Sequence, residues 1–381
     1  MNKQYKENKM LLTTLSNGDK VYKNNYSITI EFSGIRGVLS TSQLNSGYRE
    51  DLTGVFNFDS KPENGKGYCM NSDTYLEDLK TIASELGLNP EKSAGVTTAV
   101  SMKNVSIKTS EYRDLIVTAI ITAGIEVNAG RVGDPASFYE EKGEIILLEP
   151  GTINIFLNID GNLSPGTLAR AMVTCTEAKT AAIQELMARS MYSCGIATGS
   201  GTDETVIICN QNSENTFTFA GKHSKLGELI GKTVMEGVKE ALFLETGLDS
   251  KRQYSVIRRL SRFGLDDKRI IEEYINYDTN YVTEDRLIEA IEAIDNQSTL
   301  VVNSSLLAHL IDQLNWNLLE PREVAIETSR ILLSICDKYK INYSFHINDK
   351  SKEKTISSII NSFAYLLARI IYRHIIGISG R

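Results

Sequence analysis

The stretch Thr174–Asp203, TCTEAKTAAIQELMARSMYSCGIATGSGTD, joins a helical pattern to a glycine-rich loop. Apolar residues recur at helical spacing through its first part, where the charged residues Glu177 and Lys179 also lie. Its last five residues, Gly199–Asp203, combine two glycines with hydroxyl and carboxyl side chains. Charged groups beside a polar loop are what hydrolysis of a small molecule needs, so this stretch is the first candidate for a functional site.

The helix in this stretch is expected to start at Ser164-Pro165, because serine is a favoured N-cap and proline is favoured at the first helical position. We expect the helix to run to about Arg189. In a continuous helix Glu177 and Lys179 point about 200° apart, so only one of them can reach a given ligand. Glu177 lies near the apolar stripe and is expected to be partly buried, which would suit acid/base catalysis; the same spacing also fits two surface charges.

Strand patterns lie on both sides of this helix, which predicts an α/β fold with a mixed β-sheet core flanked by helices. The segment Thr152–Ile159 alternates apolar and polar residues, so we expect one buried face and one face that presents amides; Phe156 breaks the polar face. The other predicted strands are Tyr26–Phe32, Val96–Val105, Leu115–Thr122, Glu144–Leu148, Gly195–Thr198 and Thr205–Asn210, and the other predicted helices are Asn71–Leu86 and Lys225–Leu244.

Polar residues at the ends of these strands are candidates for substrate binding. A loop of small and polar residues with Asn128 and Asp134 follows a buried strand, a position where ligand-binding groups often occur, although both residues also suit Asx turns. Asn154 lies on the alternating strand. The glycine loop lacks the lysine of a phosphate-binding P-loop, yet its backbone N–H groups could still bind an oxyanion. The hydroxyls at this loop belong to Thr198, Ser200 and Thr202; a hairpin turn explains the glycines equally well.

The histidine and cysteine residues give no metal-binding pattern. His223 lies just before a predicted helix with Ser224 as its N-cap; it suits a general base or a substrate contact, and equally a surface loop. We predict no metal site, since no further histidine or cysteine has ligand spacing. Cys175 falls on the apolar stripe, where a core thiol is favoured over a nucleophile. The five cysteines form no CxxC pair, which favours reduced thiols and a cytoplasmic protein.

The pattern changes at Ser250, which divides the chain into domains 1–249 and 250–381. The first part holds 23 basic and 31 acidic residues, and the second holds 18 and 17. The second part shows six helical patterns and almost no strands, so we predict an all-α domain of unknown role. Its basic segment Lys251–Arg262 fits a solvated helix face or docking against the acidic domain.

Charge and hydropathy exclude two classes of partner. The net charge of −7 supplies no basic excess to neutralise phosphates, so we expect no nucleic-acid binding. The N-terminus has no signal-peptide core. The apolar segment Ala364–Ile378 contains Arg369, Arg373 and His374, so we interpret it as an amphipathic helix and expect no membrane span.

Five sequence blocks, taken together, resemble the adenosylcobinamide amidohydrolase family of corrinoid salvage. They occur in the family's order within roughly residues 25–247. Ser200 stands where the family usually has threonine, and the hydroxyl is kept. The helical module from Ser250 lies outside the family core. The blocks are Thr122–Pro135 (TAGIEVNAGRVGDP), Gly151–Ile155 (GTINI), Thr176–Ala182 (TEAKTAA), Ala197–Asp203 (ATGSGTD) and Gly221–Glu228 (GKHSKLGE).

The resemblance implies hydrolysis of the amide between the corrin ring and the aminopropanol arm of adenosylcobinamide. The products would be adenosylcobyric acid and aminopropanol, with the corrinoid as substrate and no cofactor. Amide hydrolysis needs a base, an oxyanion stabiliser and an acid. We assign Glu177 or Asp203 as the base, the 199–202 loop as the oxyanion site, and His223 or Lys179 as the acid or substrate anchor. A corrinoid-binding protein without catalysis and a hydrolase of another amide are the alternatives.

Overall fold

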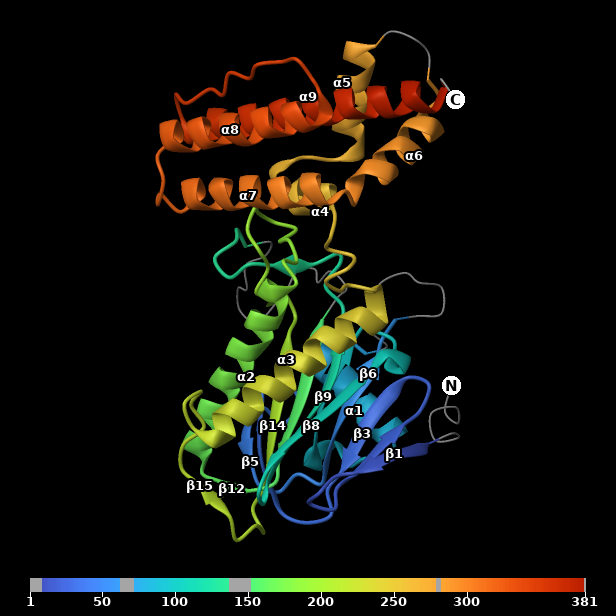
Figure 1. The fold of residues 1–381 in the computed structure, drawn as a ribbon. Coiled ribbons are helices and arrows are strands. Elements are labelled where there is room, and N and C mark those ends of the chain that lie inside the picture. Colours follow the sequence, from blue (N-terminus) through green and yellow to red (C-terminus); the bar gives the residue numbers. More distant parts are fainter. Residues whose placement is uncertain (1–8, 62–71, 137–151, 279–281, 380–381) are drawn as a thin grey trace. The chain divides into compact units, whose positions relative to one another are not determined.

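The computed structural model describes residues 9–61, 72–136, 152–278 and 282–379. The chain folds as two units, Met1–Asp249 and Ser250–Arg381 (Figure 1). The predicted architecture is confirmed: mixed sheets flanked by helices come first, and a helical region follows.

The first unit contains two large β-sheets. The outer sheet has the spatial order β1 (Met10–Thr14), β2 (Lys20–Lys23), β3 (Ser27–Glu31), β6 (Gly54–Asp59), β7 (Ser93–Thr98). The central sheet has the order β5 (Gly47–Arg49), β4 (Arg36–Ser40), β14 (Glu204–Asn210), β11 (Ile153–Ile159), β9 (Leu115–Ala123), β8 (Ser106–Tyr112). It is mixed, because β11 runs parallel to β14 and antiparallel to β9. Two short pairs are β10 (Ala129–Gly130) with β13 (Gly199–Ser200) and β12 (Asn162–Leu163) with β15 (Thr216–Phe217).

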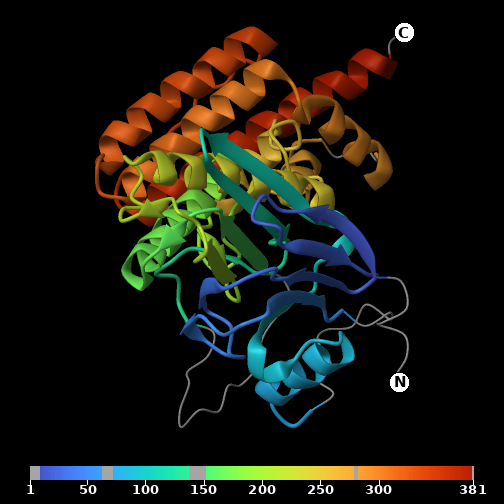
Figure 2. The ribbon, with the colours of Figure 1, turned by 90° about the horizontal axis from the view of Figure 1, so that it is seen from below.

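Helices cover the outward face of each sheet. Helix α1 (Tyr75–Glu85) packs on the outer sheet through a small apolar cluster with Phe56. Figure 2 shows this helix (cyan) on the side of the blue strands that faces away from the green and yellow helices. Helices α2 (Pro165–Glu185) and α3 (Lys225–Thr246) cover the central sheet. Short 3₁₀ turns occur at Pro90–Lys92 and Met102–Asn104.

The helix ends follow the capping residues. Ser164 accepts a hydrogen bond from the N–H of Thr167, so α2 begins where the sequence predicts. It ends at Glu185, earlier than expected, because Met187 adopts a left-handed conformation with φ of 50°. Ser224 caps α3, which ends at Gly247 with φ of 71°.

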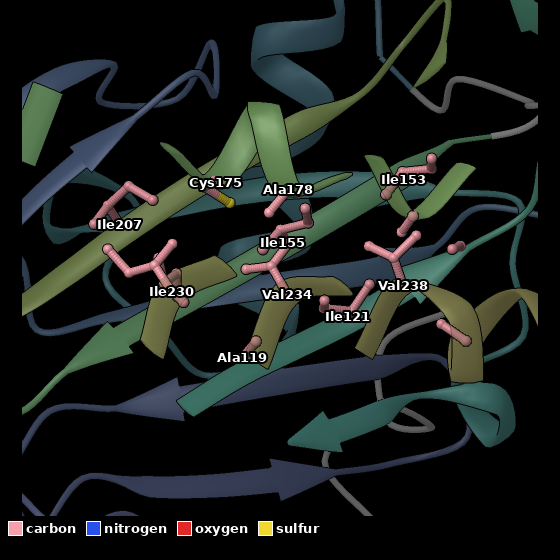
Figure 3. Close-up of a cluster of buried hydrophobic side chains, with 14 of the residues drawn as sticks. Ala119, Ile121, Ile153, Ile155, Cys175, Ala178, Ile207, Ile230, Val234 and Val238 are labelled. Atoms are coloured by element: carbon pink, nitrogen blue, oxygen red, sulfur yellow. The ribbon is translucent and has the colours of Figure 1, made fainter. Parts of the chain in front are cut away.

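Strand β11, inside the central sheet, is buried on both faces. Toward α2 and α3, Ile153 and Ile155 meet Cys175 and Ala178 of α2 in the main core (Figure 3). Toward the outer sheet, Phe156 joins a second core between the sheets.

The expected polar outer face of this strand is therefore wrong. Asn154 and Asn158 are 1% and 2% exposed, because a second sheet covers the face that the alternation left polar. Phe156 breaks the pattern because it packs in that second core.

Two of the predicted strands differ, and a third is not tested. The strand predicted over Val96–Val105 ends at Thr98. The segment Gly195–Thr198 is not a strand; only an isolated bridge joins Ile196 to Arg189. The strand predicted at Glu144–Leu148 lies outside the described residues.

The second unit is built from helices around one apolar core. They are α4 (Val256–Leu260), α5 (Asp267–Tyr277), α6 (Glu284–Asp295), α7 (Ser298–Asn315), α8 (Pro321–Tyr339) and α9 (Lys352–Ser379), with a 3₁₀ turn at Ser261–Phe263. Arg262 of the basic segment is 3% exposed and pairs with Asp312, so it is neither a solvated charge nor a docking group. Helix α9 is long and apolar enough to cross a membrane, but 56% of that apolar window is buried inside the structure, as in the core helix of a soluble protein.

Candidate functional site

The glycine loop is fixed beside the loop that follows β9. Strand β13 pairs with β10, so Gly199 lies opposite Gly130. Thr198 continues this contact: its N–H donates to the Gly130 carbonyl at 2.8 Å, and its hydroxyl accepts from the N–H of Val132 at 2.9 Å. Two segments that are about 70 residues apart in the sequence therefore form one surface.

Asp203 organises this loop. One carboxylate oxygen accepts hydrogen bonds from the Ser200 hydroxyl at 2.6 Å and from the Ser200 and Ile153 N–H groups at 3.1 Å each. The other oxygen pairs with the Lys179 ammonium of α2, and both side chains are 11% exposed. An ionised carboxylate has about four acceptor positions, so these partners occupy most of the positions at which Asp203 could contact a substrate or a water. Asp203 therefore suits a positioning role better than the expected role of base.

Two more hydroxyl contacts tie the loop to its surroundings. The Thr202 and Thr152 hydroxyls lie 2.6 Å apart, and the Thr180 hydroxyl of α2 donates to the Thr198 carbonyl at 3.2 Å. We call Thr152, Lys179, Thr198, Ser200, Thr202 and Asp203 the loop cluster. Five of its six residues are candidates from the sequence; Thr152 is the addition.

The structure places Glu177 and His223 outside the loop cluster. Glu177 is 44% exposed and pairs with Lys222 at 3.2 Å, whereas Lys179 pairs with Asp203. The side chains of Glu177 and Lys179 therefore contact different parts of the structure, as their angular separation on the helix predicts. The expected partial burial of Glu177 is wrong, because its side chain lies along the surface loop that precedes α3. His223 in that loop is exposed.

The contacts of Asp134 and the burial of Asn128 suit a structural role better than substrate binding. Asp134 accepts hydrogen bonds from the Arg131 N–H at 2.8 Å and from the Ser190 hydroxyl at 2.5 Å. The Arg131 N–H lies three residues before Asp134, so this contact is not an Asx turn, in which the side chain accepts from the backbone two residues further on. Burial raises the pKa of Asp134, but hydrogen bonds from the Ser190 and Ser193 hydroxyls outweigh this effect. The pKa is therefore lowered overall, and the carboxyl group stays ionised. Asn128 is 2% exposed.

Cys175 is also unsuited to direct chemistry. It is fully buried in the core beneath α2, and burial raises the pKa of its thiol to about 12. A thiol in this state supplies almost no thiolate at neutral pH, so the core interpretation of this residue holds.

A second group of polar side chains lies between the two sheets. Asn154 donates from Nδ2 to the Asn57 side-chain oxygen and to the Thr97 carbonyl, both at 2.9 Å. Asn57 in turn donates to the Thr122 hydroxyl at 2.8 Å, and the Tyr75 and Thr97 hydroxyls lie 3.0 Å apart. Of this inter-sheet cluster, the sequence analysis identifies Asn154 alone. The threonines on the polar sides of the neighbouring strands could have indicated the rest of the cluster.

Glu204 is the carboxyl group that sequence reasoning missed. It opens β14, directly after Asp203, and its side chain is hydrogen-bonded to the Thr41 hydroxyl. Burial raises the pKa of Glu204; the bond from Thr41 lowers it, and the charge on Asp203 raises it again. A raised carboxyl pKa is a common property of acid/base groups.

Among the residues that the structure describes, no three or more His, Cys, Asp or Glu side chains gather in a way that could hold a metal ion.

Comparisons with known proteins concern mainly the first unit. A family model described as adenosylcobinamide amidohydrolase matches residues 12–250. An uncharacterized protein of Methanocaldococcus jannaschii is 35% identical over 241 residues, which cover 59% of this chain and 88% of the relative. A Methanosarcina mazei protein named adenosylcobinamide amidohydrolase is 29% identical over 160 residues, which cover 40% of this chain and 67% of the relative.

Two solved structures show a distant likeness. One is a β-aminopeptidase from Burkholderia sp., at 12% identity, covering 58% of this chain and 80% of that one. The other is a Pyrococcus horikoshii OT3 protein, at 11% identity, covering 62% and 83%. Both TM-scores are 0.28, which is too low to bear on the fold or the chemistry.

Proposed function

Because the chain belongs to the adenosylcobinamide amidohydrolase family, we propose that it hydrolyses the amide between the corrin ring and the aminopropanol arm of adenosylcobinamide. Family membership makes it a hydrolase; the particular amide is our proposal. The products would be adenosylcobyric acid and aminopropanol, so the chain would act in cytoplasmic corrinoid salvage. In this proposal the corrinoid is the substrate, and neither a metal nor another cofactor takes part.

The observation that carries this proposal is the Lys179–Asp203 pair in the loop cluster. Negative charge develops on the carbonyl oxygen during amide hydrolysis, and a fixed positive group beside that oxygen lowers the barrier. Asp203 holds the Lys179 ammonium in one place, beside the Ser200 hydroxyl. Lys179 would stabilise the oxyanion, and the Ser200 and Thr202 hydroxyls would bind polar groups at the edge of the corrinoid.

Exposed apolar side chains next to the loop cluster support a large, partly apolar substrate. Val132 is 83% exposed, Val127 57%, Met191 42% and Tyr192 41%. Their two segments are joined, because the Met191 N–H donates to the Ala129 carbonyl at 2.8 Å. Such side chains on adjoining loops are typical of binding surfaces. We propose that this apolar rim contacts the face of the corrin ring while the loop cluster meets its polar edge.

Replacing Lys179 tests the proposal directly. Lys179→Met removes the charge and keeps most of the side-chain volume. Lys222→Met makes the same change in the loop before α3, where Lys222 forms an exposed ion pair with Glu177. We expect Lys179→Met to lower kcat for adenosylcobinamide by about 10²–10³-fold. The Lys222→Met control should stay within about twofold of wild type. Equal rates for both variants would remove Lys179 from the mechanism.

A further inference from the structure

The buried side-chain amide of Asn154 has an acceptor atom, Oδ1, without a hydrogen-bond donor among the described residues. Asn154 is 1% exposed, and its Oδ1 accepts no hydrogen bond from the described residues. The orientation of this amide is fixed, because Nδ2 donates to the Thr97 backbone carbonyl, which can only accept. An unsatisfied buried acceptor is unfavourable, so we expect a small ligand to supply a hydrogen-bond donor at this site.

Glu204 is the neighbour of Asn154 on the same face of the sheet. The parallel register of β11 and β14 pairs these two residues, so their side chains share one face, with Cα atoms about 4.8 Å apart. That face is the one toward the outer sheet, since Val206 and Phe156 from the same alternating positions pack in the inter-sheet core. A ligand donor could therefore lie between an amide oxygen and a carboxylate.

Glu204 also has the capacity to take a proton. Asp203 is occupied by Lys179 and by three loop hydrogen bonds, whereas Glu204 is held by the hydroxyl of Thr41, which is exposed. Glu204 is itself half-buried, so it is reachable from the start of the strand. Asp203 and Glu204 are consecutive, so this group and the loop cluster lie at the same end of β14. They lie on opposite faces of the sheet, because Asp203 pairs with Lys179 of α2 whereas Glu204 faces the outer sheet. A substrate amide that contacts both groups must therefore lie across the ends of the strands.

We propose that Glu204 and Asn154 bind the water that attacks the scissile amide, with Glu204 as general base and Asn154 as its partner. This inference rests on the proposed function. The water donates one hydrogen to Asn154 Oδ1 and the other to Glu204. Its oxygen bonds to the carbonyl carbon as Glu204 takes the proton. The C–N bond then breaks, and the Glu204 proton passes to the leaving amine, so that water and amide become carboxylic acid and amine.

The test compares Glu204→Gln with Glu111→Gln, an exposed glutamate of β8, using the full chain and adenosylcobinamide. We expect Glu204→Gln to lower kcat by about 10²–10⁴-fold with little change in KM, since a base acts on the chemical step. The acidic limb of the pH profile of kcat/KM should disappear in Glu204→Gln and persist in Glu111→Gln. Among the described residues, the titratable groups that interact with Glu204 are Asp203 and Tyr75, both retained in these variants.

A purely structural role would give a different result. Glu204→Asp keeps a carboxyl group and should recover part of the rate with the acidic limb, even if Glu204→Gln folds poorly. Turnover by Glu204→Gln within about twofold of wild type would overturn this inference and leave the proposed function standing. Absence of aminopropanol release by wild type would overturn the proposed function and this inference together.

Discussion

At the scale of single residues, Gly199 determines whether the loop cluster can form. A Cβ atom at this position would lie 2.2 Å from the Asp203 Oδ2 atom and 2.9 Å from the Lys179 Nζ atom. Real Cβ contacts do not come this close, so any side chain would displace the ion pair. Gly201, two residues on, has no heavy atom within 4 Å of its Cβ position.

These two glycines form a matched pair of variants. Gly199→Ala should lower kcat/KM by about 10²-fold, because a displacement of about 1 Å in a catalytic group has an effect of this size. Gly201→Ala should stay close to wild type. Steady-state rates of aminopropanol release measure both. A Gly199→Ala enzyme with full activity would contradict the role of the Lys179–Asp203 pair.

Glu204 should also affect stability in a pH-dependent way. Its pKa is raised by burial, so at pH 7 the folded state holds this carboxylate less favourably than the unfolded chain does. Glu204→Gln removes that cost and should raise the denaturant midpoint at pH 7. The gain should vanish below pH 4.5, the ordinary value for this carboxyl, where both states are protonated. A gain that is equal at pH 7 and pH 4 would contradict the raised pKa.

The sequence identifies part of the site at this scale. Lys179, Asp203 and Ser200 are candidates from residue type and loop composition alone, and helix geometry correctly separates Glu177 from Lys179. Which of the two charges faces the glycine loop depends on how α2 packs on the sheet. Glu204 has no local signal, because its burial comes from a second sheet that is distant in sequence.

At the scale of elements, the start of α3 depends on close backbone contact. A Cβ on Gly227 would lie 2.1 Å from the Gly221 carbonyl oxygen, a backbone atom that cannot rotate away. Gly231, one turn further along α3, has no heavy atom within 4 Å of its Cβ position. The two glycines therefore differ in role: Gly227 allows close contact with the backbone of Gly221, and Gly231 makes no such contact.

Alanine at these two positions should change stability in opposite directions. Gly227→Ala should lower the free energy of unfolding by about 1–3 kcal/mol, as overpacking does. Gly231→Ala should raise it by about 0.5–1 kcal/mol, because alanine is the better helix former. Chemical denaturation of both variants checks this, and destabilisation by Gly231→Ala would contradict the open space at that position.

Elements with local signals are predictable, and pairings between distant elements are not. Helices α2 and α3 follow from their serine caps, and β9, β11 and β14 follow from β-branched runs. Strands β10 and β13 have two residues each, which is too short for any periodicity. The burial of both faces of β11 depends on a second sheet whose register no local pattern records.

At the scale of the whole molecule, each unit has its own core. The main core of the first unit draws on residues between Leu115 and Leu248, and that of the second on residues between Val256 and Ile375. The family model ends at residue 250, beside the division between the units. The loop cluster and Glu204 all belong to the first unit.

A chain of residues 1–249 should therefore fold and hydrolyse adenosylcobinamide. We expect its kcat to lie within a few-fold of the full chain, since every proposed catalytic group is retained. Circular dichroism and turnover of the shortened chain test this. A well-folded but inactive 1–249 chain would show that the helical unit contributes to the reaction.

The most direct test of the central claim is incubation of the full chain with adenosylcobinamide, followed by mass spectrometry of the corrinoid. Hydrolysis of the proposed amide predicts conversion to adenosylcobyric acid with release of one aminopropanol per corrinoid, and loss of this conversion in Lys179→Met. Adenosylcobinamide that is bound but recovered intact would contradict the claim and indicate a corrinoid-binding protein.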